Sequence, residues 1–160
     1  MGYESKVNLA VAFPDAEIAD EVWSAYANDP LYVEYVKERP LYWERLTHSK
    51  GYVCFNYSSM NESPDDPWVK WYEDFPDDTT AAYQALYGYA ETMDAPAICR
   101  IMRIGGATED CEDQFWQTKR VEEEFSEFED ALAGGYYLLG GYIHRTFEFD
   151  GIGSEDWRAE

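Results

Sequence analysis

Carboxylates are the most concentrated chemically active groups in this sequence. Six of them fall within residues 122–130, namely Glu122, Glu123, Glu124, Glu127, Glu129 and Asp130. Apolar residues recur through the same stretch at helical spacing, with Val121, Phe125, Phe128 and Leu132 inside a stripe about 60° wide. The pattern predicts a helix that docks through a narrow apolar seam and presents carboxylates to solvent around the rest of its circumference.

This arrangement is unfavourable for the helix itself. Like charges three or four residues apart destabilise a helix by a few tenths of a kcal/mol. Glu129 and Asp130 also lie near the predicted C-terminal end, where the helix dipole favours cations. We therefore expect the acidic surface to serve binding rather than stability.

Carboxylates one helical turn apart are separated by about 5–6 Å, close to the spacing of successive phosphates on a nucleic-acid strand. Two further acidic clusters could extend such a row. One, expected on the same helical segment (residues 108–132), comprises Glu109, Asp110, Glu112 and Asp113. The other, in a proline-rich loop over residues 61–78, comprises Glu73, Asp74, Asp77 and Asp78. Trp68 and Trp71 in that loop are candidate aromatic anchors for a partner.

Other chemistry finds little support in the sequence. His48 and His144 are not near a recognisable nucleophile motif, and the sequence contains no phosphate-binding loop, HExxH or paired-cysteine zinc motif. We expect no catalytic residue, no cofactor and no metal site, and hence not an enzyme. A cationic group on predicted strands could instead form an anion or ligand pocket or balance neighbouring acids: Arg100, Arg103, His144 and Arg145.

The whole chain is strongly acidic, with 33 Asp and Glu against 12 Lys and Arg, a formal net charge of −21 over 160 residues. Its 14 Tyr, 8 Phe and 6 Trp exclude an acidic disordered chain. Direct binding to nucleic acid or to anionic lipid is disfavoured because both need basic residues. The charge favours a basic protein partner instead. A halophilic origin is a second explanation for so acidic a surface.

The compartment is predicted from the cysteines and the N-terminal residues. Three cysteines without paired spacing, and no apolar run typical of a secretory signal, favour a reduced cytoplasmic setting, that of the host cell if the protein is phage-encoded.

The acidic residues must be positioned by the strands and helices of the fold. The order of the predicted elements indicates an α+β fold, a mainly antiparallel sheet of about five strands with three to four helices packed on it. Residues 1–150 are expected to form one acidic domain, and residues 151–160 a short acidic tail. The strands are predicted at residues 6–13, in a hairpin over 41–58, at 97–104 and at 136–149. The helices are predicted to begin at Asp15, Pro30 and Thr79 or Thr80 and to fill most of 108–132.

In composition and in its acidic helix the chain is similar to phage- and plasmid-encoded DNA-mimic inhibitors, which block restriction, CRISPR or repair enzymes. The likeness implies a protein of the anti-restriction or anti-CRISPR type that occupies the basic cleft of a nucleic-acid-binding host enzyme or defence complex. One alternative is an inhibitor or adaptor that binds through exposed aromatic residues without mimicry. Another is a small-molecule-binding α+β protein. The oligomeric state is left open.

Overall fold

The sheet is built around strand β1 (Ser5–Phe13), whose side chains are buried on both faces. In the computed structural model, residues 5–30, 43–59, 65, 68, 82–105, 110–132, 141–143, 147–149, 152 and 157–159 are described. Val7, Leu9, Val11 and Phe13 belong to one core cluster, whereas Ala10 and Ala12 belong to the other. This confirms the strand predicted at residues 6–13 and shows that it is covered on both faces.

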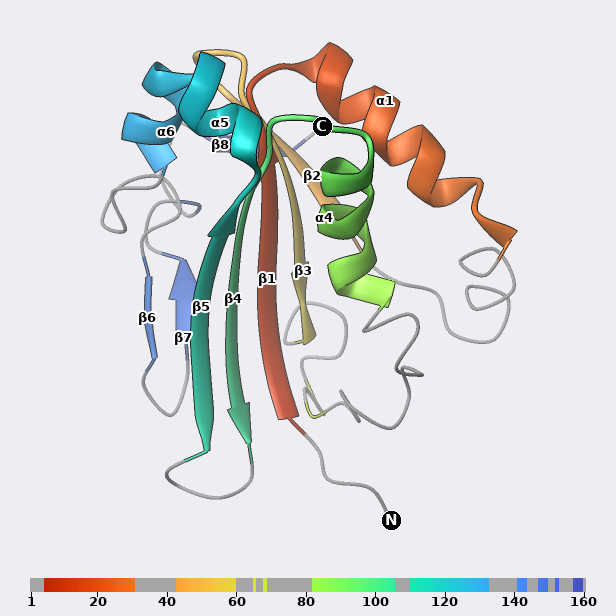
Figure 1. The fold of residues 1–160 in the computed structure, drawn as a ribbon. Helices are drawn as coiled ribbons and strands as arrows, with labels where there is room; N and C mark the ends of the chain where they lie inside the picture. Colours follow the sequence, from red (N-terminus) through yellow and green to blue (C-terminus); the bar gives the residue numbers. More distant parts are fainter. Residues whose placement is uncertain are drawn as a thin grey trace.

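The main sheet has the strand order β5-β4-β1-β3-β2-β8, and every neighbouring pair is antiparallel. Its other strands are β2 (Trp43–His48), β3 (Val53–Ser58), β4 (Ile98–Gly105), β5 (Cys111–Gln117) and β8 (Trp157–Ala159). Four helices are described in all, and they cover this six-stranded sheet (Figure 1). The fold is therefore α+β and forms a single domain, as the sequence predicted.

One face of the sheet is covered by α1 (Ala16–Ala27) and α4 (Ala82–Thr92), which pack together over it (Figure 1). Asp15 caps α1, since its carboxylate accepts a hydrogen bond of 2.9 Å from the backbone N–H of Ile18. Val22 and Tyr26 of α1 and Leu86 of α4 are buried against the strands. The helix predicted to begin at Asp15 is therefore confirmed.

The opposite face is covered by two short helices, α5 (Lys119–Glu124) and α6 (Ser126–Leu132). Their buried residues pack on the small side chains of β1, on Ile98 and Met102 of β4, and on Trp157 of β8. Because Ala10 and Ala12 leave room over the centre of the sheet, the large ring of Phe128 fits there without displacing the strand.

The predicted β2–β3 hairpin is present, and its turn contains Gly51 with a φ of 90°, which glycine adopts without strain. Val53, Phe55 and Tyr57 all face the α1–α4 side, because every second side chain of a strand lies on the same face.

The prediction of a mostly helical segment over 108–132 is wrong for its first part. Residues 111–117 form β5, which pairs with β4 along its whole length. Phe115 packs on the α5–α6 side and its neighbour Trp116 on the α1–α4 side. Adjacent side chains on opposite faces require the period of two of a strand.

The C-terminal elements also differ from the prediction. In place of one strand over 136–149, β6 (Gly141–Ile143) and β7 (Phe147–Phe149) pair with each other in a separate two-stranded sheet (Figure 1). Within the predicted tail 151–160, residues 157–159 form the edge strand β8 and Trp157 is buried. The helix predicted to begin at Pro30 lies outside the described residues from residue 31 on, as does most of the loop 61–78.

Candidate functional site

The six carboxylates that the sequence singled out lie on α5 and α6, at the end of the molecule where β1 meets α1 (Figure 1). We call this set, Glu122, Glu123, Glu124, Glu127, Glu129 and Asp130, the acidic face. Five of them are exposed, and Glu129 is half-buried. Two cations, Lys119 and Arg120, share the two helices with them.

The start of α5 is fixed to the sheet by Thr118, which is 5% exposed. Its hydroxyl accepts a hydrogen bond of 2.9 Å from the N–H of Ala97 and donates one of 2.7 Å to the carbonyl of Ala95. The Thr118 N–H donates in turn to the Ala97 carbonyl at 2.9 Å. These bonds anchor the acidic face to the segment that leads into β4.

The helix predicted through residue 132 is interrupted at Phe125, whose φ of −129° and ψ of 52° are not helical. Val121, Phe128 and Leu132 are buried as the seam predicted, but Phe125 is only half-buried. Helical-turn spacing within either helix is therefore limited, among these acids, to pairs such as Glu127 and Asp130. The acids form a patch on two short helices rather than a row along one.

Gln117, at the end of β5, links the two helices. Its side-chain amide donates hydrogen bonds to Glu122 of α5 at 3.1 Å and to Glu129 of α6 at 2.9 Å. A single neutral donor thus holds two carboxylates of the acidic face near each other.

The two cations of α5 neutralise little of this surface. Lys119 lies 3.8 Å from Glu123 with 83% of its side chain exposed, and Arg120 forms an ion pair with Glu124. The hydrogen bond that Arg120 donates to the carboxylate of Glu124 raises the pKa of Arg120 above its ordinary value, and the negative charge of Glu124 adds to this effect. Exposed pairs of this kind are screened and contribute little to stability. Glu127 and Asp130 have no ion pair among the described residues.

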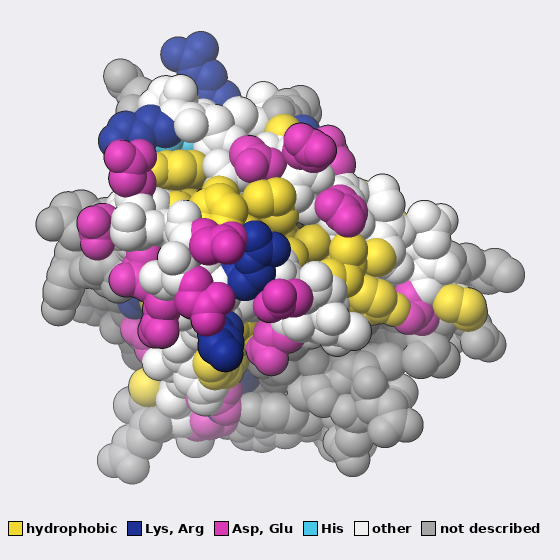
Figure 2. Space-filling model, turned by 45° about the horizontal axis from the view of Figure 1, so that its top comes forward, with side chains coloured by type: hydrophobic (Ala, Val, Ile, Leu, Met, Phe, Trp, Pro, Cys, Tyr) yellow, Lys and Arg dark blue, Asp and Glu magenta, His cyan; other side chains and the backbone are white. Residues whose placement is uncertain are grey.

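Figure 2 looks onto this end of the molecule. Asp and Glu side chains surround a strip of apolar side chains, and only a few Lys and Arg lie among them. The surface thus combines dense negative charge with some exposed apolar area.

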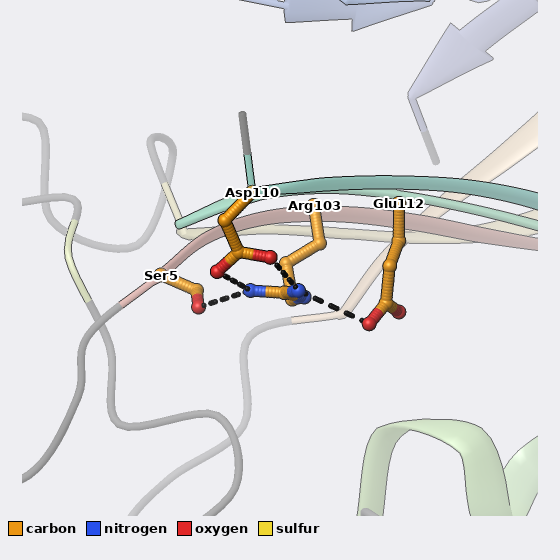
Figure 3. A network of polar contacts seen from close by, with 4 residues as sticks. All are labelled: Ser5, Arg103, Asp110 and Glu112. Atoms are coloured by element: carbon orange, nitrogen blue, oxygen red, sulfur yellow. Dashed lines mark hydrogen bonds and ion pairs between the residues drawn. The ribbon is translucent and has the colours of Figure 1, made fainter. Parts of the chain in front are cut away.

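The second acidic cluster serves a different purpose from the one predicted. Asp110 and Glu112 bind the buried guanidinium of Arg103, at 2.7 and 3.0 Å, and Ser5 of β1 accepts from the same group at 2.9 Å (Figure 3). Asp113 similarly pairs with Arg100 at 2.8 Å.

These acids therefore belong to the sheet and not to the helix, and their charge is compensated by neighbouring strands. The expectation that Arg100 and Arg103 balance neighbouring acids is confirmed. His144, Arg145 and Glu109 lie outside the described residues.

Of the predicted loop site, only Trp68 is described. Its half-buried ring lies under the ammonium of Lys6 at 5.0 Å from the ring centroid, a cation–π contact within the chain. The other predicted members, Trp71 and the acids Glu73, Asp74, Asp77 and Asp78, lie outside the described residues.

Sequence reasoning missed the contribution of the β2–β3 hairpin to this site. Tyr52, in the β2–β3 turn, packs its ring edge-on against Phe128 of α6, with centroids 5.3 Å apart. Burial raises the pKa of its hydroxyl above the ordinary value, and the negative charge of Glu127 raises it further. No local sequence signal links residues 52 and 128, because only the folded sheet brings them together.

Among the described residues, no group of three or more His, Cys, Asp or Glu side chains is placed to hold a metal ion. No described helix is long and apolar enough to cross a membrane.

Comparisons of this chain with protein-family models, with curated proteins and with solved structures each give no match.

Proposed function

We propose that this protein is a binding protein whose acidic face occupies the basic nucleic-acid-binding cleft of a partner protein. The partner would be a host enzyme or a defence complex, and the activity would be inhibition by exclusion of nucleic acid. The observation that carries the proposal is the contrast within α5 and α6. Their apolar residues Val121, Phe128 and Leu132 are at most 2% exposed, while five carboxylates point to solvent.

The amount of charge supports a functional role. A net charge of −21 is well beyond the magnitude of about 2–8 that solubility requires of a small domain. Concentrated surface charge accelerates association with an oppositely charged cleft and excludes partners of like charge. The support rests on density and exposure of charge, since the break at Phe125 interrupts the regular helical spacing that a long phosphate-like row would need.

The hydrogen bonds that anchor α5 and α6 also support a binding role for the acidic face. Thr118 and Gln117 connect α5 and α6 to the sheet and to each other through hydrogen bonds of 2.7–3.1 Å. A fixed array of charges loses less conformational entropy on binding than a flexible acidic tail.

The test begins with capture of partners from host lysate on the immobilised protein, at about 50 mM and about 500 mM NaCl. Retained proteins are then challenged with double-stranded DNA and with RNA. We expect the partner to be retained at low salt, lost at high salt and displaced by nucleic acid. A partner that withstands both treatments would indicate the alternative, an adaptor surface without mimicry.

A matched pair of variants assigns the binding to the acidic face. The test variant carries Glu123→Gln, Glu127→Gln and Asp130→Asn, and the control carries Glu17→Gln, Glu44→Gln and Asp65→Asn, all at exposed positions. Each variant removes three negative charges. If every exposed pair contributes about 0.5–1 kcal/mol, the test variant weakens affinity about tenfold or more. If both variants lose the same affinity for the partner, net charge alone explains the binding and the proposed site is wrong.

A further inference from the structure

A cleft of about 240 Å³ lies between α1 and the turn that joins α4 to β4, and Arg120 of α5 also lines it. Most of its lining is apolar, from Ile18, Val22, Met93, Ala95 and Pro96. The volume is below the range of about 300–1,000 Å³ that is usual for small-molecule sites. The cleft therefore suits a single side chain of a partner better than a separate ligand.

The apolar lining is held by the core but keeps surface in contact with water. Val22 is 1% exposed and Ala95 is 8% exposed, and both belong to the core on the α1–α4 side of the sheet. Ile18 and Met93 pack on the edge of this core and are only half-buried. A side chain in the cleft would remove part of this apolar surface from water. Figure 2, which looks onto the end of the molecule where α5 lies, shows apolar side chains at the surface with Asp and Glu around them.

Asp94 lines the same cleft at a position where glycine is usual. The N–H of Asp94 donates to the carbonyl of Glu91 at 3.1 Å, and the N–H of Ala95 donates to the carbonyl of Ala90 at 2.9 Å, a pattern that ends many helices. The φ of Asp94 is 56°, in the left-handed region that favours glycine. An exposed carboxylate is therefore present where glycine would be less strained. A local cost of this kind points to a function for the side chain.

The surroundings of the cleft are acidic. Helix α1 carries no Lys or Arg but has three carboxylates, Glu17, Asp20 and Glu21. Glu21 and Asp94 both line the cleft and are exposed. Among the described lining residues the one cation is Arg120, which donates to the carbonyl of Asp94 at 3.2 Å and forms an ion pair with Glu124. These charges favour an apolar side chain that is carried by a basic segment and disfavour one carried by an acidic segment.

We propose that this cleft receives one aliphatic side chain, such as leucine, that lies between basic residues of the partner. The inference rests on the proposed function, because it names the segment of the basic partner that docks next to the acidic face. It also deepens that function, since an apolar anchor with a charged rim is the usual arrangement of a specific protein interface. Nucleic acid has no such side chain, so the cleft would distinguish the partner from other phosphate-binding proteins.

The test uses the full chain and three peptides in NMR titrations at about 50 mM NaCl. They are Ac-Lys-Arg-Leu-Arg-Lys-NH₂, its counterpart with serine in place of leucine, and Ac-Glu-Glu-Leu-Glu-Glu-NH₂. We expect the basic leucine peptide to shift the methyl resonances of Ile18 and Met93 in a saturable way. The methyl of Met102, which is buried on the other side of the sheet, should not move.

The other two peptides separate the apolar contact from the charge. The serine peptide should bind about tenfold more weakly, because it buries no apolar side chain. The acidic peptide should give no saturable shift. Raising NaCl to about 500 mM should weaken both basic peptides, but the ratio of their affinities should persist because salt does not screen an apolar contact.

Two variants with matched controls test the lining. Ile18→Ala should weaken the basic leucine peptide about threefold to tenfold. Ile104→Ala is its control, because it makes the same change at a half-buried isoleucine on the other face of the sheet. Asp94→Gly should raise the melting temperature, since glycine adopts this φ without strain, and yet weaken the same peptide about twofold to fourfold. Glu44→Gln, at an exposed position on β2, should weaken it less.

Several results would overturn the cleft as a docking site. These are equal affinity for the leucine and serine peptides, unmoved methyls of Ile18 and Met93, equal effects of the two Ile→Ala variants, or an unchanged affinity of the Asp94→Gly variant. If they occur while the variant at Glu123, Glu127 and Asp130 still loses its nucleic-acid-displaceable partner, the cleft is wrong and the proposed function stands. If the leucine peptide binds as expected but nucleic acid displaces no partner, the proposed function is wrong and the cleft stands.

Discussion

Replacing Arg103 should expose how strongly the second acidic cluster depends on its cation. The Arg103 side chain is 4% exposed, while those of Asp110 and Glu112 are 32% and 31% exposed. Arg103→Met preserves most of the side-chain volume but leaves two carboxylates facing each other without a positive charge. Removing one partner of a buried ion pair costs about 3–5 kcal/mol, and partial solvation of both acids lowers our expectation to about 2–3 kcal/mol.

Thermal and urea unfolding measure this loss. In a chain of this size each kcal/mol lowers the melting temperature by about 2–4 °C, so Arg103→Met should melt about 5–10 °C lower than the parent. Lys119→Met is the control, because it removes a cation whose side chain is 83% exposed and should change stability by less than about 0.5 kcal/mol.

The triple variant Arg103→Met, Asp110→Asn, Glu112→Gln separates charge from packing. Neutralising the two acids should restore at least half of the lost stability, because the penalty comes from uncompensated carboxylates. The reasoning is refuted if Arg103→Met is as stable as the parent, or if neutralising the acids lowers stability further.

Three other properties follow from the same structure. Iodoacetamide should modify the exposed Cys111 in the native protein, whereas Cys54 and Cys99 should react only after unfolding, because burial raises the pKa of both thiols. Detection of a label on Cys54 or Cys99 of the native protein by mass spectrometry would contradict this prediction. Burial also raises the pKa of Tyr87, so the folded chain keeps protons that the unfolded chain releases. Its free energy of unfolding should therefore be constant at neutral pH and fall above about pH 9, by up to about 1.4 kcal/mol per pH unit for each such group, and a flat urea-unfolding profile up to about pH 10.5 would disprove it. Finally, Gln117→Ala removes both hydrogen bonds between β5 and the two acidic helices, which should lower the free energy of unfolding by about 1 kcal/mol and speed amide hydrogen exchange in α6. Unchanged exchange in α6 would show that these hydrogen bonds do not hold the helix in place.

Local patterns predicted the parts of the fold that are determined locally. The strand predicted at residues 6–13, the helix predicted to begin at Asp15 and the hairpin predicted over 41–58 are all present. In each of these, the residues that decide the structure are close together in the sequence.

The predictions of secondary structure were wrong where residues distant in the sequence determine the local structure. Residues 111–117 resemble an acidic helix when considered alone, but Arg100 and Arg103 on the neighbouring strand provide the charges that make a strand favourable there. Residues 157–159 resemble a tail until β2 supplies an edge with which to pair.

The candidate site was predicted in part for the same reason. The exposure of the carboxylates on α5 and α6 follows from the apolar seam, whose Val121, Phe128 and Leu132 are buried. The break at Phe125 was not predicted, and neither was the approach of Tyr52, which comes from a hairpin far away in the sequence.

Because the acidic segment is divided into α5 and α6, the proposed recognition depends on the folded state. Helices of six and seven residues are too short to persist alone in water, so this charge array exists only while its apolar side rests on the sheet. A partner that binds the array must therefore stabilise the folded state, and its presence in excess should raise the melting temperature. By the same linkage, we expect substitutions in the core beneath Phe128 to weaken the proposed recognition although they change no charge.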